Sequence, residues 1–245
     1  DSSLLASGSS DTTVNIWNTG GKCLQTLRGH SDIVNSVGFS HDSKLLASAS
    51  ADKTVIIWDV NGKSLQALRG HCDMVRSVTF SHDSKLIASA SNDQTIIIWD
   101  TSGKCVRTLR AHSDTVRFVT FSHDSKHLAS ASNDQTVIIW DTNGRCLQRL
   151  QGHSSSVLSV TFSHDSKLLA SASSDQTIFI WNANGEHLRT LRGHSSSVWS
   201  VAFSHDSTLL ASGSSDRTVI LWDTQSGQYL QVFRGHSDTV RSVAF

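Results

Sequence analysis

The chain has 245 residues, and its 21 Lys and Arg residues balance its 21 Asp and Glu residues without any block of like charge. This balance argues against charge-driven binding of nucleic acid or of an anionic membrane surface. No apolar run approaches the roughly 20 residues that cross a bilayer, and the first residues lack the basic and apolar regions of a signal peptide. We therefore expect a soluble chain with no nucleic-acid or membrane partner.

The first residues predict short β-strands separated by turns rich in Gly, Asn, Asp and Ser. Strands are expected at Leu4 to Ser9, Val14 to Trp17, Cys23 to Leu27 and Val34 to Phe39. Tight turns are expected at Ser10-Asp11-Thr12, Gly20-Gly21 and Ser40-His41-Asp42-Ser43. The pattern restarts at Lys44, so each unit is predicted to be an antiparallel meander of four strands.

This unit returns at a fixed interval. Six tryptophans spaced 41 residues apart close its third strand: Trp17, Trp58, Trp99, Trp140, Trp181 and Trp222. A period of this length is typical of propellers, solenoids or arrays. Because the repeat runs from end to end, we expect a single domain over residues 1–245, made of six repeats of about 41 residues.

The third strand of each repeat is a continuous apolar run, as in Val55 to Trp58 and Ile96 to Trp99. Such a run predicts burial of both faces, and hence a sheet packed on either side. A ring of sheets buries every face except the rims, so the pattern predicts a β-propeller without helices. Later Gly20-Gly21 equivalents, such as Asn61-Gly62 and Asn143-Gly144, predict two-residue hairpins with positive φ.

Two dipeptides recur with the repeat. Gly-His occurs at Gly29-His30, Gly70-His71, Gly152-His153, Gly193-His194 and Gly235-His236, with Ala111-His112 as a variant. Trp-Asp occurs at Trp58-Asp59, Trp99-Asp100, Trp140-Asp141 and Trp222-Asp223, with Trp17-Asn18 and Trp181-Asn182 as variants. Over its whole length the chain resembles the WD40 family. Turns such as Ser81-His82-Asp83-Ser84, in place of Ser-Pro-Asp-Gly, make it similar to the C-terminal WD40 arrays of fungal NACHT-type, NLR-like signalling ATPases.

The resemblance implies an all-β WD40 β-propeller of six four-stranded antiparallel blades. It also implies that the C-terminal segment, Val240 to Phe245, pairs with Leu4 to Ser9 and so completes the N-terminal blade of a monomeric ring. A truncated seven-bladed ring and a ring built from several chains are the alternatives.

Each repeat holds a histidine, a serine and an aspartate, which superficially satisfy a nucleophilic triad. Together with the tryptophan they resemble the buried structural tetrad of the family, and six copies favour architecture over catalysis. The sets are His30/Ser48/Asp52/Trp58, His71/Ser89/Asp93/Trp99, His112/Ser130/Asp134/Trp140, His153/Ser171/Asp175/Trp181, His194/Ser212/Asp216/Trp222 and His236/Ser7/Asp11/Trp17. The serine two positions later, such as Ser50, is an alternative member. No catalytic residue and no enzyme activity is predicted.

No metal site or cofactor is predicted either. The turn histidines are His41, His82, His123, His164 and His205. Because neighbouring sheets pack about 10 Å apart, these imidazoles are expected to lie too far apart to share a zinc ion. Gly62-Lys63-Ser64 lacks the earlier glycine of a phosphate loop. The four cysteines show no ligand spacing, and free thiols without an Asn-x-Ser/Thr sequon favour a cytoplasmic location.

The repeats differ most at the residue after the valine that follows each Gly-His pair: Asn35, Arg76, Arg117, Leu158, Trp199 and Arg241. By resemblance this position lies at the start of the innermost strand, around the mouth of the channel. Trp and Arg are enriched at binding hot spots, so we expect a protein or peptide partner with acidic and apolar residues. The neighbouring variable residues Ile33, Met74, Thr115, Ser156, Ser197 and Thr239 are expected to share that surface.

Two alternatives stay open. Each arginine has an aspartate three residues earlier, as with Asp73 and Arg76, so the pairs could be local salt bridges worth about 0–1 kcal/mol. The near-identical turns could instead serve a multivalent propeller that binds a small ligand or glycan.

Overall fold

The structure, a computed structural model, describes residues 4–245. Residues 1–3 of the predicted domain lie outside the described residues. The chain forms two compact units, Asp1–Phe121 and Ser122–Phe245, and each is described by itself below. Whether all 245 residues act as one domain therefore stays a prediction.

The described part of the first unit, residues 4–121, contains twelve strands. They are β1 (Leu4–Gly8), β2 (Val14–Asn18), β3 (Cys23–Leu27), β4 (Val34–Phe39), β5 (Leu45–Ser50), β6 (Thr54–Asp59), β7 (Ser64–Arg69), β8 (Val75–Phe80), β9 (Leu86–Ser91), β10 (Thr95–Asp100), β11 (Cys105–Arg110) and β12 (Val116–Phe121). A three-stranded sheet, β1-β2-β3, is followed by the antiparallel meanders β4-β5-β6-β7 and β8-β9-β10-β11. The predicted strand order and boundaries are confirmed here to within one or two residues.

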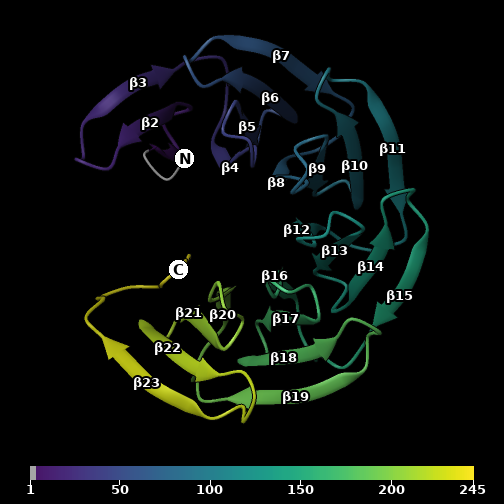
Figure 1. The fold of residues 1–245 in the computed structure, drawn as a ribbon, viewed down its shortest axis with the longest axis vertical. Helices are drawn as coiled ribbons and strands as arrows, with labels where there is room; N and C mark the ends of the chain where they lie inside the picture. The colour runs from purple at the N-terminus through teal and green to yellow at the C-terminus, as the bar shows by residue number, and fades with distance from the viewer. Residues whose placement is uncertain (1–3) are drawn as a thin grey trace. The chain divides into compact units, whose positions relative to one another are not determined.

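The second unit repeats this plan. Its strands are β13 (His127–Ser132), β14 (Val137–Asp141), β15 (Cys146–Leu150), β16 (Val157–Phe162), β17 (Leu168–Ser173), β18 (Thr177–Asn182), β19 (His187–Arg192), β20 (Val198–Phe203), β21 (Leu209–Ser214), β22 (Thr218–Asp223) and β23 (Tyr229–Arg234). Antiparallel order is kept in β13-β14-β15, β16-β17-β18-β19 and β20-β21-β22-β23. Within each unit taken by itself, the sheets follow an arc, with the first strand of a four-stranded sheet on its concave side and the last on its convex side (Figure 1).

The cores explain why the third strand of each sheet is apolar throughout. In β6, Val55 and Ile57 pack with Trp99 of the following sheet, whereas Ile56 and Trp58 pack with the preceding sheet. Alternate side chains of one strand therefore fill two different cores, as the strand's period of two requires. Burying each of these side chains stabilises the fold by about 1.5–3 kcal/mol.

The turns after the tryptophans differ from the predicted two-residue hairpins. Only the glycine, for example Gly62 with φ +84°, has positive φ, and its N–H donates to the Asp59 carbonyl at 3.0 Å. The Asp59 N–H donates to the Lys63 carbonyl at 2.9 Å, and the register between β6 and β7 shifts at Ile57/Trp58. The connection is thus a longer loop with a bulge, in which glycine alone meets the need for a left-handed residue.

Val240 to Phe245, the segment predicted to close a ring, forms no regular strand. Its backbone nevertheless sits beside β20 and β21 as β4 and β8 sit beside the sheets before them. The Val240 N–H donates to the Ser214 carbonyl at 3.0 Å, as the Val34 N–H does to the Ser9 carbonyl at 3.0 Å. The segment therefore lies where the first strand of a following sheet would begin, and its pairing with Leu4 to Ser9 stays a prediction.

Within residues 4–245 no helix is long and apolar enough to span a membrane.

Candidate functional site

The first complete His-Ser-Asp-Trp set lies in the sheet β4–β7. His30 Nδ1 lies 2.9 Å from Asp52 Oδ2, and His30 Nε2 lies 2.7 Å from Ser48 Oγ. The Trp58 indole N–H donates to the same Ser48 oxygen at 2.8 Å. Ser50, the alternative serine, instead donates to the Asp32 carbonyl at 2.9 Å and accepts from the Asp52 N–H at 3.0 Å.

The structure brings three further sets together in the same way. His71, His153 and His194 lie 2.8–2.9 Å from Asp93, Asp175 and Asp216, and 2.8–2.9 Å from Ser89, Ser171 and Ser212. The indoles of Trp99, Trp181 and Trp222 donate to those serines at 2.8–2.9 Å. Each set ties the loop before a sheet to that sheet's second and third strands.

Two sets are divided between the units. Trp140 donates to Ser130, and Trp17 donates to Ser7, both at 2.9 Å. Asp11 accepts from the Thr13 hydroxyl at 2.6 Å. His112 and His236 belong to the opposite unit from the other members of their sets, so their places in these tetrads stay predictions.

Asp134 has a partner that the sequence did not predict. Its Oδ1 accepts from the Thr136 N–H at 3.0 Å and from the Thr136 hydroxyl at 2.7 Å. Its Oδ2, however, lies 3.6 Å from Arg149 Nη1 of the same sheet, and Arg149 also donates to Thr136 Oγ1 at 3.2 Å. A salt bridge thus shares the carboxylate, and the membership of Asp134 in the predicted tetrad stays a prediction.

The physical reason for the salt bridge is a single change on the outer strand. Arg149 pairs with Ile138 across the ladder between β14 and β15. The residues at the equivalent ladder position in the other repeats are uncharged and short: Thr26, Ala67, Thr108, Thr190 and Val232. Only Arg149 has the length and the charge to reach the turn aspartate, and the spacing of the repeat gave no sign of this contact.

The protonation states in these sets suit structure rather than catalysis. Burial alone would raise the pKa of Asp216, but bonds from Thr218, the Ser195 N–H and His194 outweigh it and lower the pKa to about 2. Burial lowers the pKa of His194 below its ordinary value despite the opposing effect of Asp216. At neutral pH this set holds an Asp216 anion and a neutral His194 imidazole. Because Ser48 is 0% exposed, no substrate can reach its hydroxyl.

A β-bulge carries the most variable position of the repeat. In the ladder between β4 and β5, Val34 pairs with Ser50 and Ser36 with Ala49, which leaves Asn35 as the extra residue. The same shift leaves Arg76, Leu158 and Trp199 unpaired at the starts of β8, β16 and β20. A bulge releases a residue from the ladder and re-aims its side chain, and bulges are common beside functional sites.

In the first unit these side chains take different partners. Asn35 Nδ2 donates to the Val75 carbonyl at 2.9 Å, which ties one sheet to the next. Arg76 Nε donates to Asn92 Oδ1 at 2.8 Å rather than to Asp73, whose carboxylate accepts from the Met74 N–H. The alternative of a local salt bridge between Asp73 and Arg76 is therefore wrong. Burial, followed by repulsion from Arg76, lowers the pKa of Arg117, although Asp114 acts in the opposite sense.

In the second unit Trp199 and Arg241 form a pair. The Arg241 guanidinium carbon lies 5.2 Å from the centroid of the Trp199 ring, and the indole N–H donates to Ser215 Oγ at 2.6 Å. Leu158 differs from the prediction, because its side chain is only 7% exposed and little of it is left for a partner. Leu158 is buried, whereas Trp199 is partly exposed and its indole N–H donates to Ser215.

The neighbouring variable residues are held by their backbone. The carbonyls of Ile33, Met74, Ser156 and Ser197 accept from residues of the adjacent second-strand turns at 2.8–3.0 Å. Their side chains are thereby left on the surface, and Ile33 and Met74 are 41% and 37% exposed. Thr115 and Thr239 are partly exposed.

Phe118, which the sequence argument missed, is 37% exposed on β12, next to Arg117. Five of the six repeats have serine at this position: Ser36, Ser77, Ser159, Ser200 and Ser242. That single break in the repeat was the available signal.

The turn histidines correct one expectation. The ring centroids of His41 and His82 lie 3.6 Å apart, and those of His164 lie 4.2 and 3.8 Å from His123 and His205. The general spacing of sheets does not apply here, because these turns follow the first strands, which contact one another between adjacent sheets. Among residues 4–245, no group of three or more His, Cys, Asp or Glu residues is placed to hold a metal ion.

Comparison with family models matches six copies of the WD domain, G-beta repeat, at residues 1–18, 21–59, 62–100, 103–141, 144–182 and 185–223. A search of curated proteins found no match. The all-β sheets match the blades of a six-bladed WD40 propeller. Repeats of this kind are generally protein-interaction scaffolds, and propellers of the family are typically non-catalytic. The chain belongs to the WD40 repeat family.

Proposed function

We propose that this chain is a non-catalytic interaction module that binds a protein or peptide. The contact residues are the bulged residues at the start of the first strand of each sheet. The observation that carries the proposal is that the position differing most between repeats is the one released from the ladder at Arg76 and Trp199. Strand pairing does not require a different residue at this position in each repeat. Variation at a position freed from pairing points to recognition.

The charges in the first unit favour an acidic partner. The Arg76 guanidinium donates to the neutral amide oxygen of Asn92, not to a carboxylate. Its positive charge repels the Arg117 guanidinium and so adds to the effect of burial in lowering the pKa of Arg117. Two neighbouring guanidiniums that repel one another gain from an anion placed between or beside them. Exposed Ile33 and Met74 add apolar contact area.

Trp199 and Arg241 give the second unit the side-chain types most enriched at binding hot spots. The hydrogen bond from Trp199 to Ser215 holds the indole in one orientation, which lowers the entropy that a partner must remove. A partner with apolar and acidic residues suits both units. We include in the proposal a monomeric, cytoplasmic chain that acts as the sensing end of a larger signalling protein; four exposed free cysteines support that location.

Charge reversal tests the proposal. Partners captured from an array of peptides with mixed acidic and apolar residues should bind the double variant Arg76→Glu, Arg117→Glu at least tenfold more weakly. The matched control is Lys44→Glu, Lys85→Glu, which makes the same charge change in two exposed turns of the same unit. Equal binding to both double variants would show that this surface is the wrong one.

Stoichiometry separates this proposal from a multivalent glycan-binding propeller. The near-identical Ser-His-Asp-Ser turns favour several equivalent sites in the second case. One ligand per chain supports the interaction module, and several glycans per chain support the alternative.

A further inference from the structure

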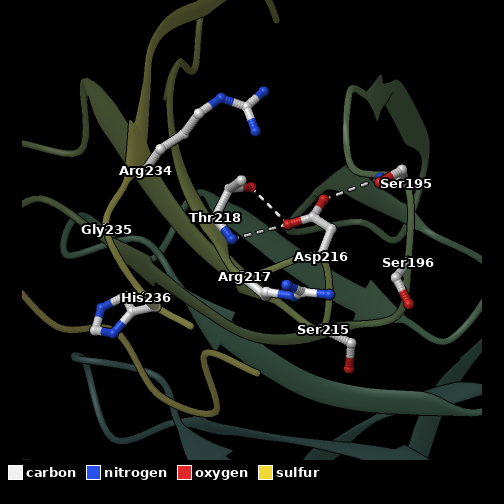
Figure 2. Close-up of a pocket in the computed structure, with 9 residues that line it drawn as sticks. All are labelled: Ser195, Ser196, Ser215, Asp216, Arg217, Thr218, Arg234, Gly235 and His236. Atoms are coloured by element: carbon white, nitrogen blue, oxygen red, sulfur yellow. Dashed lines mark hydrogen bonds between the residues drawn. The ribbon is translucent and has the colours of Figure 1, made fainter. Parts of the chain in front are cut away.

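The second unit contains an open pocket of about 400 Å³ that none of the bulged residues lines. Three segments build it: Ser195 and Ser196 before β20, the turn 215–218 between β21 and β22, and Arg234 to His236 after β23 (Figure 2). This volume lies within the range of small-ligand sites, which is about 300–1,000 Å³.

Two arginines dominate the charge of the pocket. Arg234 extends from the end of β23 on one side of Asp216, and Arg217 lies on the other side (Figure 2). Within the part of the chain that the structure describes, neither guanidinium forms an ion pair or a hydrogen bond. Each therefore keeps its full set of donors for a ligand.

Asp216, the carboxylate in the pocket wall, does not neutralise them. Its Oδ1 accepts from the Thr218 N–H at 3.0 Å and from the Thr218 hydroxyl at 2.6 Å. Its Oδ2 accepts from the Ser195 N–H at 2.9 Å and lies 2.8 Å from His194 Nδ1. The single negative charge of Asp216 stands against the two positive charges of Arg217 and Arg234, so the pocket keeps an excess of positive charge.

Hydroxyl donors surround the same space. Ser195, Ser196 and Ser215 line the pocket. Ser215 Oγ already accepts the Trp199 indole N–H at 2.6 Å, which leaves its own hydrogen free to donate elsewhere. Guanidinium groups together with hydroxyls match a tetrahedral anion with several acceptor oxygens.

We propose that this pocket binds a phosphate monoester. Arg217 and Arg234 contact the phosphate oxygens, the serine hydroxyls supply further donors, and the remaining volume admits the group that carries the phosphate. The inference goes beyond the interaction surface proposed above, since it uses different residues and needs no peptide contact at the bulges.

The repeats supply conservative variants for the test. Gln176 has φ 73° at the position equivalent to Arg217, which has φ 68°, and Gln151 occupies the position equivalent to Arg234. Arg217→Gln and Arg234→Gln therefore introduce residues that this fold already accepts at those sites. The control is Arg192→Gln, which removes the arginine equivalent to Arg234 one repeat earlier and lies outside this pocket.

The probes are inorganic phosphate, a nucleoside monophosphate, and a Gly-Ser-Gly peptide with and without phosphoserine. Binding is followed by NMR through the indole N–H of Trp199, assigned with Trp199→Phe, because that group bonds to a residue of the pocket. A charge-assisted hydrogen bond contributes about 1.5–3 kcal/mol. We therefore expect each pocket variant to lose about tenfold or more in affinity, and Arg192→Gln to bind as the wild type does.

The arms also identify the source of the phosphate. Preference for phosphopeptide over nucleotide assigns a modified protein as the ligand, and the reverse order assigns a small molecule; either result supports the pocket. The inference is overturned if no probe binds, if both pocket variants bind like the wild type, or if the unphosphorylated peptide binds equally well. Because Arg76 and Arg117 are not involved, their reversal should leave phosphate binding unchanged, which separates this test from that of the proposed function.

Discussion

Arg241 lies over the indole ring of Trp199, with its guanidinium carbon 5.2 Å from the ring centroid. The indole N–H of Trp199 donates a hydrogen bond to Ser215 Oγ. The last variable residue of the chain thus contacts the variable residue of the preceding repeat, and we expect their contributions to stability to be coupled.

A double-mutant cycle on Trp199→Leu and Arg241→Gln measures that coupling. A partly exposed cation–π contact contributes about 0.5–1 kcal/mol, so the free energies of unfolding of the two single variants should fail to add by about that amount. Urea denaturation with a constant m-value is the measurement. Additive effects within error would mean that the ring and the guanidinium are neighbours without energetic coupling.

Ser48→Ala tests the tetrad. The variant leaves two buried groups, the Trp58 N–H and His30 Nε2, without their hydrogen-bond partner. An unsatisfied buried group costs about 1–3 kcal/mol, so we expect the free energy of unfolding to fall by about 2 kcal/mol or more. Adding Trp58→Phe removes one orphaned donor, so in that background Ser48→Ala should cost less. Equal costs in the two backgrounds would contradict the assignment of Ser48 as the shared oxygen.

Stability should depend on pH in two steps. The folded pKa values of His153 and His194 lie below the ordinary value of 6.5, chiefly because of burial. The unfolded chain then binds more protons, so stability should fall as the pH decreases below about 6.5. Asp216 has a folded pKa of about 2, below the ordinary 3.8. Its contribution is present above pH 3.8 and is lost as the pH falls toward 2.

Denaturation midpoints measured at intervals from about pH 7.5 down to about pH 2 show both steps. His194→Gln should flatten the decline between pH 6.5 and 5, because one of the groups that titrates differently on unfolding has been removed. If the decline is as steep in the variant as in the wild type, His194 does not contribute to it.

Ser84 occupies the last position of a Ser-His-Asp-Ser turn, where the usual Ser-Pro-Asp-Gly turn has glycine. Ser84 has a φ of 57°, in a region that favours glycine. Its hydroxyl, however, accepts a hydrogen bond from the Asp42 N–H of the neighbouring turn at 3.0 Å. Ser84→Ala keeps the strain and loses the bond, so it should lower the free energy of unfolding by about 1 kcal/mol. Ser84→Gly loses the bond but relieves the strain, so it should be the more stable variant. Thermal unfolding that places alanine at or above glycine would contradict this account.

The sequence by itself determined the repeat, the strand order, and the His, Asp and Trp of the tetrads that the structure describes within one unit. The interval between tryptophans and the continuous apolar third strand leave few ways to bury both faces of β6 or β10, and the packing of Val55 and Ile56 into opposite cores follows from that pattern. Membership of the tetrads was equally accessible, because buried indole N–H and carboxylate groups must find partners at fixed positions of each repeat.

Only the tertiary structure showed which contacts the variable residues make. Spacing along the chain could not tell Ser48 from Ser50, since both point to the same face of β5, and only their neighbours in space separate them. The salt bridge between Asp134 and Arg149 likewise joins two strands of one sheet, at a position where the other repeats have no charge. The bulges, the burial of Leu158, the close approach of the turn histidines and the pocket around Arg217 and Arg234 each depend on how adjacent sheets and loops converge. A sequence period fixes which residues are equivalent, but the contacts of equivalent residues depend on distances between segments that are remote along the chain.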